Sequence, residues 1–165
     1  KTLKEALKNA DVFIGVSAAN CLDAEMVLSM NNYPAIFAMA NPNPEIKPEI
    51  VHEILKGKEY VLATGRSDYP NQINNLLGFP FIFRGALDVE ASKITMNMKM
   101  AASEALAVLA REKEIPEEIK KAYNREFEFS NNYIFPTPFD PRLCELVSGA
   151  VSLAAIQDKV ARKNI

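Results

Sequence analysis

Residues 60–88, YVLATGRSDYPNQINNLLGFPFIFRGALD, contain a strand pattern and a polar loop that follows it directly. The apolar run at 60–63 predicts a buried β-strand, and the turn-forming and charged residues at 65–70 predict the loop that ends it. Two adjacent amides, Asn74 and Asn75, then precede a run of leucines and phenylalanines. Ligands bind just past the carboxyl ends of the strands in an open parallel sheet. This stretch therefore predicts a ligand-binding loop at the end of a strand.

Two further apolar runs, 11–16 and 35–40, predict buried strands, the first of them covered on both faces. Helical patterns with short links separate the three runs. The order strand–helix–strand–helix–strand predicts a parallel sheet with right-handed crossovers. Since the carboxyl ends of parallel strands meet at one edge, we expect Ser17, Asn41 and Asn75 to lie along a single edge of the sheet.

Residues that favour helix ends place the predicted helices. Thr2 and Glu5 have capping-box spacing in a helix over 1–9. Later end signals are Asp23 before a helix to Met30, Pro48 and Gly57 at the two ends of the next, and Asp140-Pro141 before a last helix to about Ala161. Helices are also expected at 95–113 and 116–123, with an extended segment at 131–138. The second half of the chain is therefore predicted to be mainly helical.

The overall composition indicates one ordinary globular domain. The chain has 165 residues, of which 48% are hydrophobic and 24% charged, and its formal net charge is −2. Such a charge, spread along the chain, argues against nucleic acid or an anionic membrane as a partner. No apolar run approaches the roughly 20 residues of a membrane span, and no signal peptide is apparent. Cys21 and Cys144 fit no metal-ligand spacing, so we expect reduced thiols in a cytoplasmic protein.

No glycine pattern for binding phosphate is present. The six glycines fit neither G-x-G-x-x-G nor G-x-x-x-x-G-K-[ST]. His52, the single histidine, is expected on the polar side of its helix, which leaves no Ser/His/Asp set. Polar loops at the carboxyl ends of the strands, without a phosphate-binding loop, are typical of one half of a dinucleotide-binding fold. The predicted fold class is α/β: the carboxyl-terminal half of a doubly wound, Rossmann-like parallel sheet followed by C-terminal helices, in a single domain over 1–165.

Several blocks of the sequence, in the same order, resemble the carboxyl-terminal part of malic enzymes of the bacterial and archaeal-like branch. These blocks are DVFIGVS at 11–17, AMANPNPEI at 38–46, ATGRSDYPNQINN at 63–75, GFP at 78–80 with FRGALD at 83–88, and PFDPRL at 138–143. The resemblance covers nearly the whole chain. It implies a C-terminal segment of the NAD(P)-binding domain, with the phosphate-binding half and the N-terminal catalytic domain outside these residues.

The resemblance also implies an activity and its ligands. The family oxidatively decarboxylates (S)-malate to pyruvate and carbon dioxide, with NAD or NADP and with Mg²⁺ or Mn²⁺. By resemblance, the substrate-binding residues are Asn41, Asn74 and Asn75, and the cofactor-binding residues are Ser17, Ala18, Ala19, Asn41 and Asn75. An amide suits this junction because it can donate to a carboxylate and accept from a carboxamide.

The family's catalytic Lys and Tyr and its acidic metal ligands match no residue of this chain. We therefore expect no catalytic residue and no metal ligand within it, and no activity of the isolated 165 residues. The implied partners are (S)-malate and pyruvate, the remainder of the enzyme, and further copies in a homodimer or larger homo-oligomer. By resemblance, the residue that selects between NAD and NADP follows a strand upstream of residues 1–165.

Other interpretations of the same residues stay open. Asn41 could form an Asx turn before Pro42, and Asn74 and Asn75 could cap a helix. The sequence also departs from the family: Ala18-Ala19-Asn20 replaces a Gly-rich turn, and Phe81 replaces a usual glycine beside the amide pair, which would reshape the site. These departures favour a non-catalytic binding or assembly module that keeps the fold. A malolactic enzyme, which shares the fold and produces lactate, is a third hypothesis.

Overall fold

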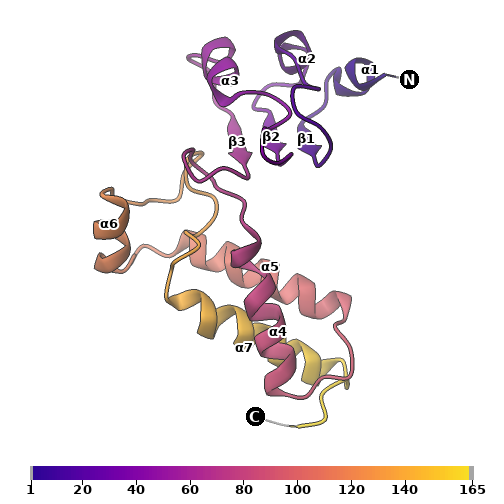
Figure 1. Cartoon of the computed structure of the whole chain (residues 1–165), viewed down its shortest axis with the longest axis vertical. Coiled ribbons are helices and arrows are strands. Elements are labelled where there is room, and N and C mark those ends of the chain that lie inside the picture. The colour runs from indigo at the N-terminus through magenta and orange to yellow at the C-terminus, as the bar shows by residue number, and fades with distance from the viewer. Residues whose placement is uncertain (1, 164–165) are drawn as a thin grey trace. The chain divides into compact units, whose positions relative to one another are not determined.

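The computed structural model describes residues 2–163, which fall into two compact units (Figure 1). Unit 1 comprises Lys1–Ile73 with Ser130–Asn132, and unit 2 comprises Asn74–Phe129 with Tyr133–Ile165. Lys1, where we expected the first helix to begin, lies outside the described residues. The single domain over 1–165 stays a prediction.

Unit 1 is built on a parallel sheet of three strands, as predicted. Strands β1 (Val12–Gly15), β2 (Ala35–Ala38) and β3 (Val61–Thr64) pair in the order β1-β2-β3. Figure 1 shows the three arrows side by side and pointing the same way. Helices α2 (Ala24–Leu28) and α3 (Pro48–Ile54) form the two connections. The strand ends therefore bring the loops after β1, β2 and β3 to one edge of the sheet.

The helices of unit 1 have the N-terminal signals that the sequence predicts, but they are shorter than predicted. The capping box of Thr2 and Glu5 is present at the start of α1 (Leu3–Leu7). The Asp23 carboxylate accepts a hydrogen bond from the Met26 amide as the N-cap of α2. Helix α3 begins at Pro48, but Leu55 is its C-terminal cap. Gly57, which we expected in that role, lies two residues further on with a φ of 80°.

The two faces of the sheet differ in burial. One face, which includes Phe13, Ile36 and Leu62, is buried in a core with the helices of unit 1. On the other face, the row that pairs Ile14, Phe37 and Ala63 runs from 66% exposed at Ile14 to fully buried at Ala63. The prediction that residues 11–16 are covered on both faces is therefore wrong for the described chain. Strand β1 carries apolar side chains that the described residues leave exposed.

Unit 2 is helical. It contains a 3₁₀ turn η1 (Asn75–Leu77) and the helices α4 (Phe79–Asp88), α5 (Met96–Arg111), α6 (Glu117–Tyr123) and α7 (Arg142–Gln157). Helices α4 and α5 both pack on α7 (Figure 1). A Cβ added at Gly85 would lie 2.3 Å from the Ser148 carbonyl oxygen, so the absence of a side chain there allows α4 to approach α7 closely.

Three details of unit 2 differ from the sequence predictions. The sequence did not predict α4, because its short aromatic and proline-containing run at 79–83 does not separate a helix from a strand. Helix α7 ends at Gln157 rather than near Ala161. Its N-cap position is Pro141, although the Asp140 carboxylate still accepts a hydrogen bond from the Arg142 amide at 3.0 Å.

No helix within residues 2–163 combines the length and apolar character needed to cross a bilayer.

Candidate functional site

The candidate site lies at the carboxyl edge of the sheet in unit 1. Ser17 is two residues beyond the end of β1, and Asn41 is three residues beyond the end of β2. Both residues are exposed, and the two strands are hydrogen-bonded neighbours. The parallel sheet thus brings two of the predicted site residues to the same edge, as the sequence predicts.

A buried carboxylate connects the two loops that carry these residues. The Glu45 side chain is fully buried, and its Oε1 accepts a hydrogen bond from the Ser17 amide at 3.0 Å. Its Oε2 accepts a second one from the Ala40 amide, also at 3.0 Å. Hydrogen bonds that involve a carboxylate are stronger than neutral ones. One side chain therefore links the loop after β1 to the loop after β2.

The end of β1 makes room for this carboxylate. A Cβ placed on Gly15 would lie 2.4 Å from both Cδ and Oε1 of Glu45, which is too close for non-bonded atoms. Backbone hydrogen bonds from Asn20 to the Pro44 carbonyl and from Leu22 to the Glu45 carbonyl hold the same two loops together. The edge of the sheet is therefore held by both main-chain and side-chain bonds.

The loop 17–20 adopts its turn without strain at the two alanines. Positive φ occurs at Asn20, at 58°, and Ala18 and Ala19 are not among the residues with positive φ. Asn tolerates the left-handed region better than most residues. The two alanines therefore need no left-handed backbone conformation in this loop. The non-catalytic module stays an alternative hypothesis.

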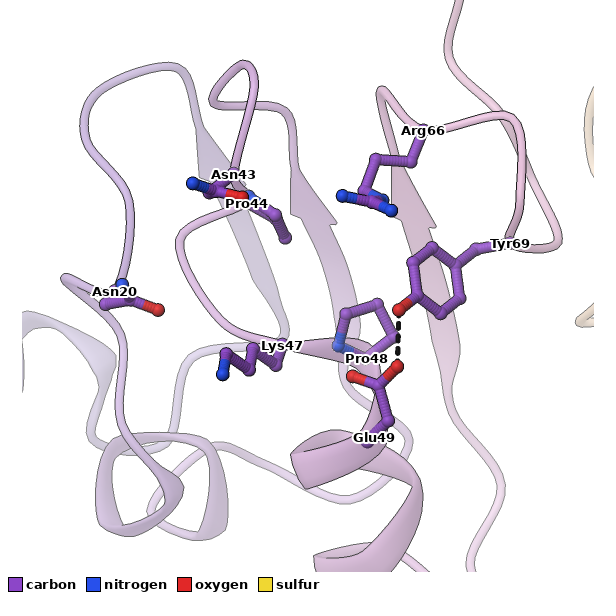
Figure 2. Close-up of a pocket in the computed structure, with 8 residues that line it drawn as sticks. All are labelled: Asn20, Asn43, Pro44, Lys47, Pro48, Glu49, Arg66 and Tyr69. Carbon is purple, nitrogen blue, oxygen red and sulfur yellow. Dashed lines mark hydrogen bonds between the residues drawn. The ribbon is translucent and has the colours of Figure 1, made fainter.

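A cavity of about 710 Å³ opens beside these loops (Figure 2). Its lining residues come from the loops after all three strands and from the start of α3: Asn20, Asn43, Pro44, Lys47, Pro48, Glu49, Arg66 and Tyr69. Figure 2 shows Arg66 and Tyr69 on one side of the cavity and Asn20 and Asn43 on the other. The amide and charged side chains in this lining make the cavity suitable for a polar ligand.

Two polar pairs fix the wall that follows β3. The Tyr69 hydroxyl donates a hydrogen bond to the Glu49 carboxylate, which lowers the pKa of Glu49 and raises the pKa of Tyr69. Arg66 binds Asp68 through Nε–Oδ1 at 2.8 Å and Nη2–Oδ2 at 2.7 Å. These bonds raise the pKa of Arg66 and lower that of Asp68. Much of the Arg66 charge is thus neutralised by its neighbour.

Asn71 supports the loop after β3 from within. Its side chain is buried, and Nδ2 donates hydrogen bonds to the carbonyl oxygens of Leu62, at 2.9 Å, and Asn131, at 2.7 Å. The Ile73 amide also donates to the Thr64 carbonyl at 2.8 Å. The loop therefore returns to the end of β3 before the chain enters unit 2.

The paired amides Asn74 and Asn75 have different environments in unit 2. The Asn74 Oδ1 accepts a hydrogen bond from the Leu76 amide at 2.9 Å and caps η1, so the capping interpretation is correct for Asn74. The Asn75 side chain is exposed and makes no hydrogen bond within residues 2–163. Asn75 is placed within unit 2 only, so its position on the same edge as Ser17 and Asn41 stays a prediction.

Phe81 belongs to the helical core rather than to the exposed surface. Its partly buried side chain packs against the core that α4, α5 and α7 form. In that position the ring fills space between helices of unit 2. The expected reshaping of the site by Phe81 stays a prediction.

The described residues offer few groups that could bind a metal ion together. Residues 2–163 contain no group of three or more His, Cys, Asp or Glu side chains that could hold a metal ion. Glu49, the carboxylate that lines the cavity, is bound by Tyr69, and the nearby Asp68 is bound by Arg66. The described residues therefore do not fit a metal ion by themselves.

Sequence reasoning missed the role of Glu45 and the lining of the cavity. The sequence shows that Glu45 lies between a strand and a helix, but it does not show that a carboxylate there is buried. The apolar neighbours Pro44 and Ile46, both buried, are the only local indication. Glu49, Arg66 and Tyr69 are likewise exposed or half-buried residues whose meeting depends on the tertiary fold.

Comparison with known proteins gives consistent matches. The model of the family "Malic enzyme, NAD binding domain" matches residues 1–121. A probable NADP-dependent malic enzyme of Rickettsia prowazekii is 54% identical over 163 residues, covering 98% of this chain and 21% of the relative. An NADP-dependent malic enzyme of Rhizobium meliloti is 57% identical over 167 residues, covering 100% of this chain and 21% of the relative.

A bifunctional malic/malolactic enzyme of Bacillus subtilis is 50% identical over 161 residues, covering 98% of this chain and 35% of the relative. Among solved structures, malic enzyme from Pyrococcus horikoshii matches with a TM-score of 0.84 and 39% identity over all of this chain and 34% of that one. Entamoeba histolytica malic enzyme gives 0.83 and 39% over 99% of this chain and 30% of that one. The chain thus spans 21% to 38% of the length of the proteins it matches.

Proposed function

The chain belongs to the family of malic enzyme NAD-binding domains, and we propose that it is part of an NAD(P)-dependent malic enzyme. That enzyme would oxidise and decarboxylate (S)-malate to pyruvate and carbon dioxide while it reduces NAD or NADP. The likeness over the whole chain to malic enzymes and the edge geometry support the same conclusion. Within the enzyme, these residues would supply the loops at the nicotinamide and the substrate.

The observation that carries the proposal is the pair of exposed amides that no internal bond occupies. Within residues 2–163, neither Asn41 nor Asn75 uses its side chain in a hydrogen bond, so both amides are available to a ligand. We assign to Asn41 and Asn75 the binding of the malate carboxylate and the nicotinamide carboxamide. We assign to Ser17, Ala18 and Ala19 the contact of the loop backbone with the cofactor. Asn74, although a cap, would help to position Asn75.

The remaining groups would come from the rest of the enzyme. When bound, Mg²⁺ or Mn²⁺ supplies a positive charge that polarises a carbonyl oxygen. The described residues do not fit the ion, so we assign its ligands, the catalytic Lys and Tyr, and the phosphate-binding loop to the rest of the enzyme. The exposed face of β1 gives that part of the protein a surface to cover. A homo-oligomer in the cytoplasm completes the proposal.

A malolactic activity is the second candidate, because a 50% identical relative is a bifunctional malic/malolactic enzyme. The two activities share malate as the substrate and differ in the product, which is pyruvate in one case and lactate in the other. Product analysis therefore separates them without any assumption about the site.

The test uses the full-length protein with (S)-malate, NAD or NADP, and Mn²⁺. We expect malate-dependent formation of reduced cofactor and of pyruvate, with no activity from the isolated 165 residues. Lactate as the main product would favour the malolactic alternative. A full-length protein that forms neither product would overturn the proposal, and turnover by the isolated chain would show that the catalytic groups are misassigned.

A further inference from the structure

We propose that Glu45 is a positioning residue that couples the cofactor loop to the substrate loop, an inference that rests on the function proposed above. The cofactor loop is the segment 16–20, which contains Ser17, and the substrate loop is the segment 39–43, which contains Asn41. The carboxylate of Glu45 binds one backbone amide in each loop. The two loops would therefore be displaced together when a ligand moves either one.

The geometry favours a fixed connection over a passive contact. Glu45 is fully buried, and each of its oxygens has its own N–H donor at 3.0 Å. Among the described residues, no lysine or arginine forms an ion pair with it. The two amides are thus its stabilising partners, and loss of either would leave a buried polar group without compensation. The carboxylate consequently resists a change in the spacing of the loops.

The positions of the two amides explain why this connection would matter for the reaction. The Ser17 amide belongs to a residue assigned to the cofactor. The Ala40 amide is adjacent in sequence to Asn41, which is assigned to the substrate. A ligand that orders one loop therefore removes part of the ordering cost for the ligand at the other loop, which is a coupling free energy between the two. By linkage, the effect of cofactor on substrate affinity equals the reverse effect.

Gly15 supplies a second way to perturb the same group. Its missing Cβ leaves the space that Cδ and Oε1 of Glu45 occupy. Gly15→Ala would displace the carboxylate without removing it, whereas Glu45→Gln replaces one acceptor oxygen with a donor NH₂ that faces an N–H. Both changes disturb the connection by different chemistry. Glu53→Gln is the matched control, because Glu53 is an exposed carboxylate on α3 at a distance in sequence from both loops.

The first measurement is the affinity of the full-length protein for NADPH or NADH, with and without (S)-malate. A reduced cofactor cannot oxidise malate, so the ternary complex does not react. Wild type and Glu53→Gln are expected to bind the cofactor about fivefold or more tightly with malate present. In Glu45→Gln and Gly15→Ala the ratio should fall to within about twofold of one. A merely structural role would weaken both affinities and leave their ratio unchanged.

The second measurement is amide hydrogen exchange in the unliganded full-length protein, which requires no activity and, for its first comparison, no variant. The Ser17 and Ala40 amides should exchange at least about tenfold more slowly than unprotected amides, as hydrogen-bonded groups do. Glu45→Gln should speed exchange at one or both of them, with no change at the β2 amides.

The outcomes separate the two proposals. Unprotected Ser17 and Ala40 amides in wild type would overturn the connection even if both variants fail to fold. The role of Glu45 would be overturned if the variants keep the wild-type ratio of cofactor affinities with and without malate, or if wild type itself shows no such coupling. Malate turnover by wild type would leave the proposed function intact in either case. If wild type is protected at both amides but does not turn over malate, the proposed function fails and the positioning role fails with it.

Discussion

The amide side chains of Asn41 and Asn75 differ from that of Asn74 in what they bind within the chain. The Asn74 Oδ1 accepts a hydrogen bond from the Leu76 amide. The side chains of Asn41 and Asn75 are exposed and form no hydrogen bond with other residues in the described part of the chain. A polar side chain that serves neither a cap nor a turn is available for a ligand. The Asx-turn interpretation of Asn41 thus has no support among residues 2–163.

The first prediction concerns Asn75→Asp in the full-length enzyme. The substitution keeps the size of the side chain, removes both N–H donors and adds a negative charge beside an anionic substrate. Loss of a charge-assisted hydrogen bond costs about 1.5–3 kcal/mol. We expect kcat/KM for malate to fall by roughly tenfold to a few hundredfold. Steady-state kinetics measures the effect, and Tm should change little because Asn75 is exposed.

The matched control is Asn32→Asp, which has the same chemistry on an exposed residue in the turn before β2. Asn71, although in the loop just before the amide pair, is unsuitable, because its buried Nδ2 donates to two carbonyl oxygens that a carboxylate would repel. Loss of stability with unchanged kcat/KM in folded Asn75→Asp would show that Asn75 has only a structural role.

Tyr133 provides a prediction about pH. Its hydroxyl is buried and has no hydrogen-bond partner in the described part of the chain. Burial, with a smaller effect from the Asp140 charge, raises the pKa of Tyr133 to about 12. Because an unfolded tyrosine has a pKa near 10, the folded state holds the proton more tightly. This contribution to stability is complete below about pH 10 and disappears between about pH 10 and 12.

The measurement is the free energy of unfolding of wild type and Tyr133→Phe across that range of pH. Tyr133→Phe should lose the part of the pH dependence that comes from this residue. At neutral pH it should be as stable as wild type or more stable, because it removes an unpaired buried hydroxyl. A Tyr133→Phe protein that is less stable by more than about 1 kcal/mol would mean that the hydroxyl has a bonding partner.

At the scale of elements, one arginine joins the start of α7 to the segment that follows α5. Arg142 binds the buried Asp140 carboxylate through Nε at 3.0 Å and Nη2 at 2.7 Å. Its Nη1 donates to Glu112 at 3.0 Å and to the Glu114 carbonyl at 2.8 Å. These bonds raise the pKa of Arg142, and Asp140 has no exposed side-chain surface.

Arg142→Ala is expected to destabilise the protein by about 3–5 kcal/mol, since it leaves a buried carboxylate without its partner. Arg142→Lys should recover only part of this loss, because an ammonium cannot form the same fork of bonds. Thermal or denaturant unfolding measures both. Arg162→Ala, on an exposed residue, serves as the control. If Arg142→Ala lowers the free energy of unfolding by less than about 1 kcal/mol, these bonds stabilise the protein no more than ordinary surface ion pairs do.

Helices and strands were predictable from the sequence where the pattern of apolar residues agrees with the residues that favour helix ends. The three strands, the Thr2 and Asp23 caps and the Pro48 start all follow from residues within a few positions. The edge position of Ser17 and Asn41 follows from the parallel order. The buried carboxylate of Glu45 was not predictable, because it depends on a space left at Gly15, thirty positions earlier. Helix α4 was missed because it begins with a short aromatic and proline-containing run at 79–83, which does not separate a helix from a strand.

At the scale of the whole molecule, the exposed stripe on β1 indicates what the described chain requires from elsewhere. Val12, Ile14 and Val16 are 49%, 66% and 77% exposed, although their sequence is that of a buried strand. The chain spans 21% to 38% of the length of the malic enzymes it matches. We therefore expect the rest of the proposed enzyme to cover this face of the sheet.

The last prediction uses Ile14→Lys to test whether the rest of the enzyme covers this face of β1, in the isolated chain and in the full-length protein. In the isolated chain the side chain is exposed, so the substitution should change the free energy of unfolding by no more than about 0.5 kcal/mol. In the full-length protein it should cost at least about 2 kcal/mol, since it removes a buried isoleucine and adds a charge to an apolar contact. Glu53→Lys, on the exposed side of α3, should be mild in both settings. Denaturant unfolding of the four proteins gives the comparison. If Ile14→Lys is equally mild in the full-length protein, this face of β1 stays exposed there, and another part of the sheet must adjoin the phosphate-binding half.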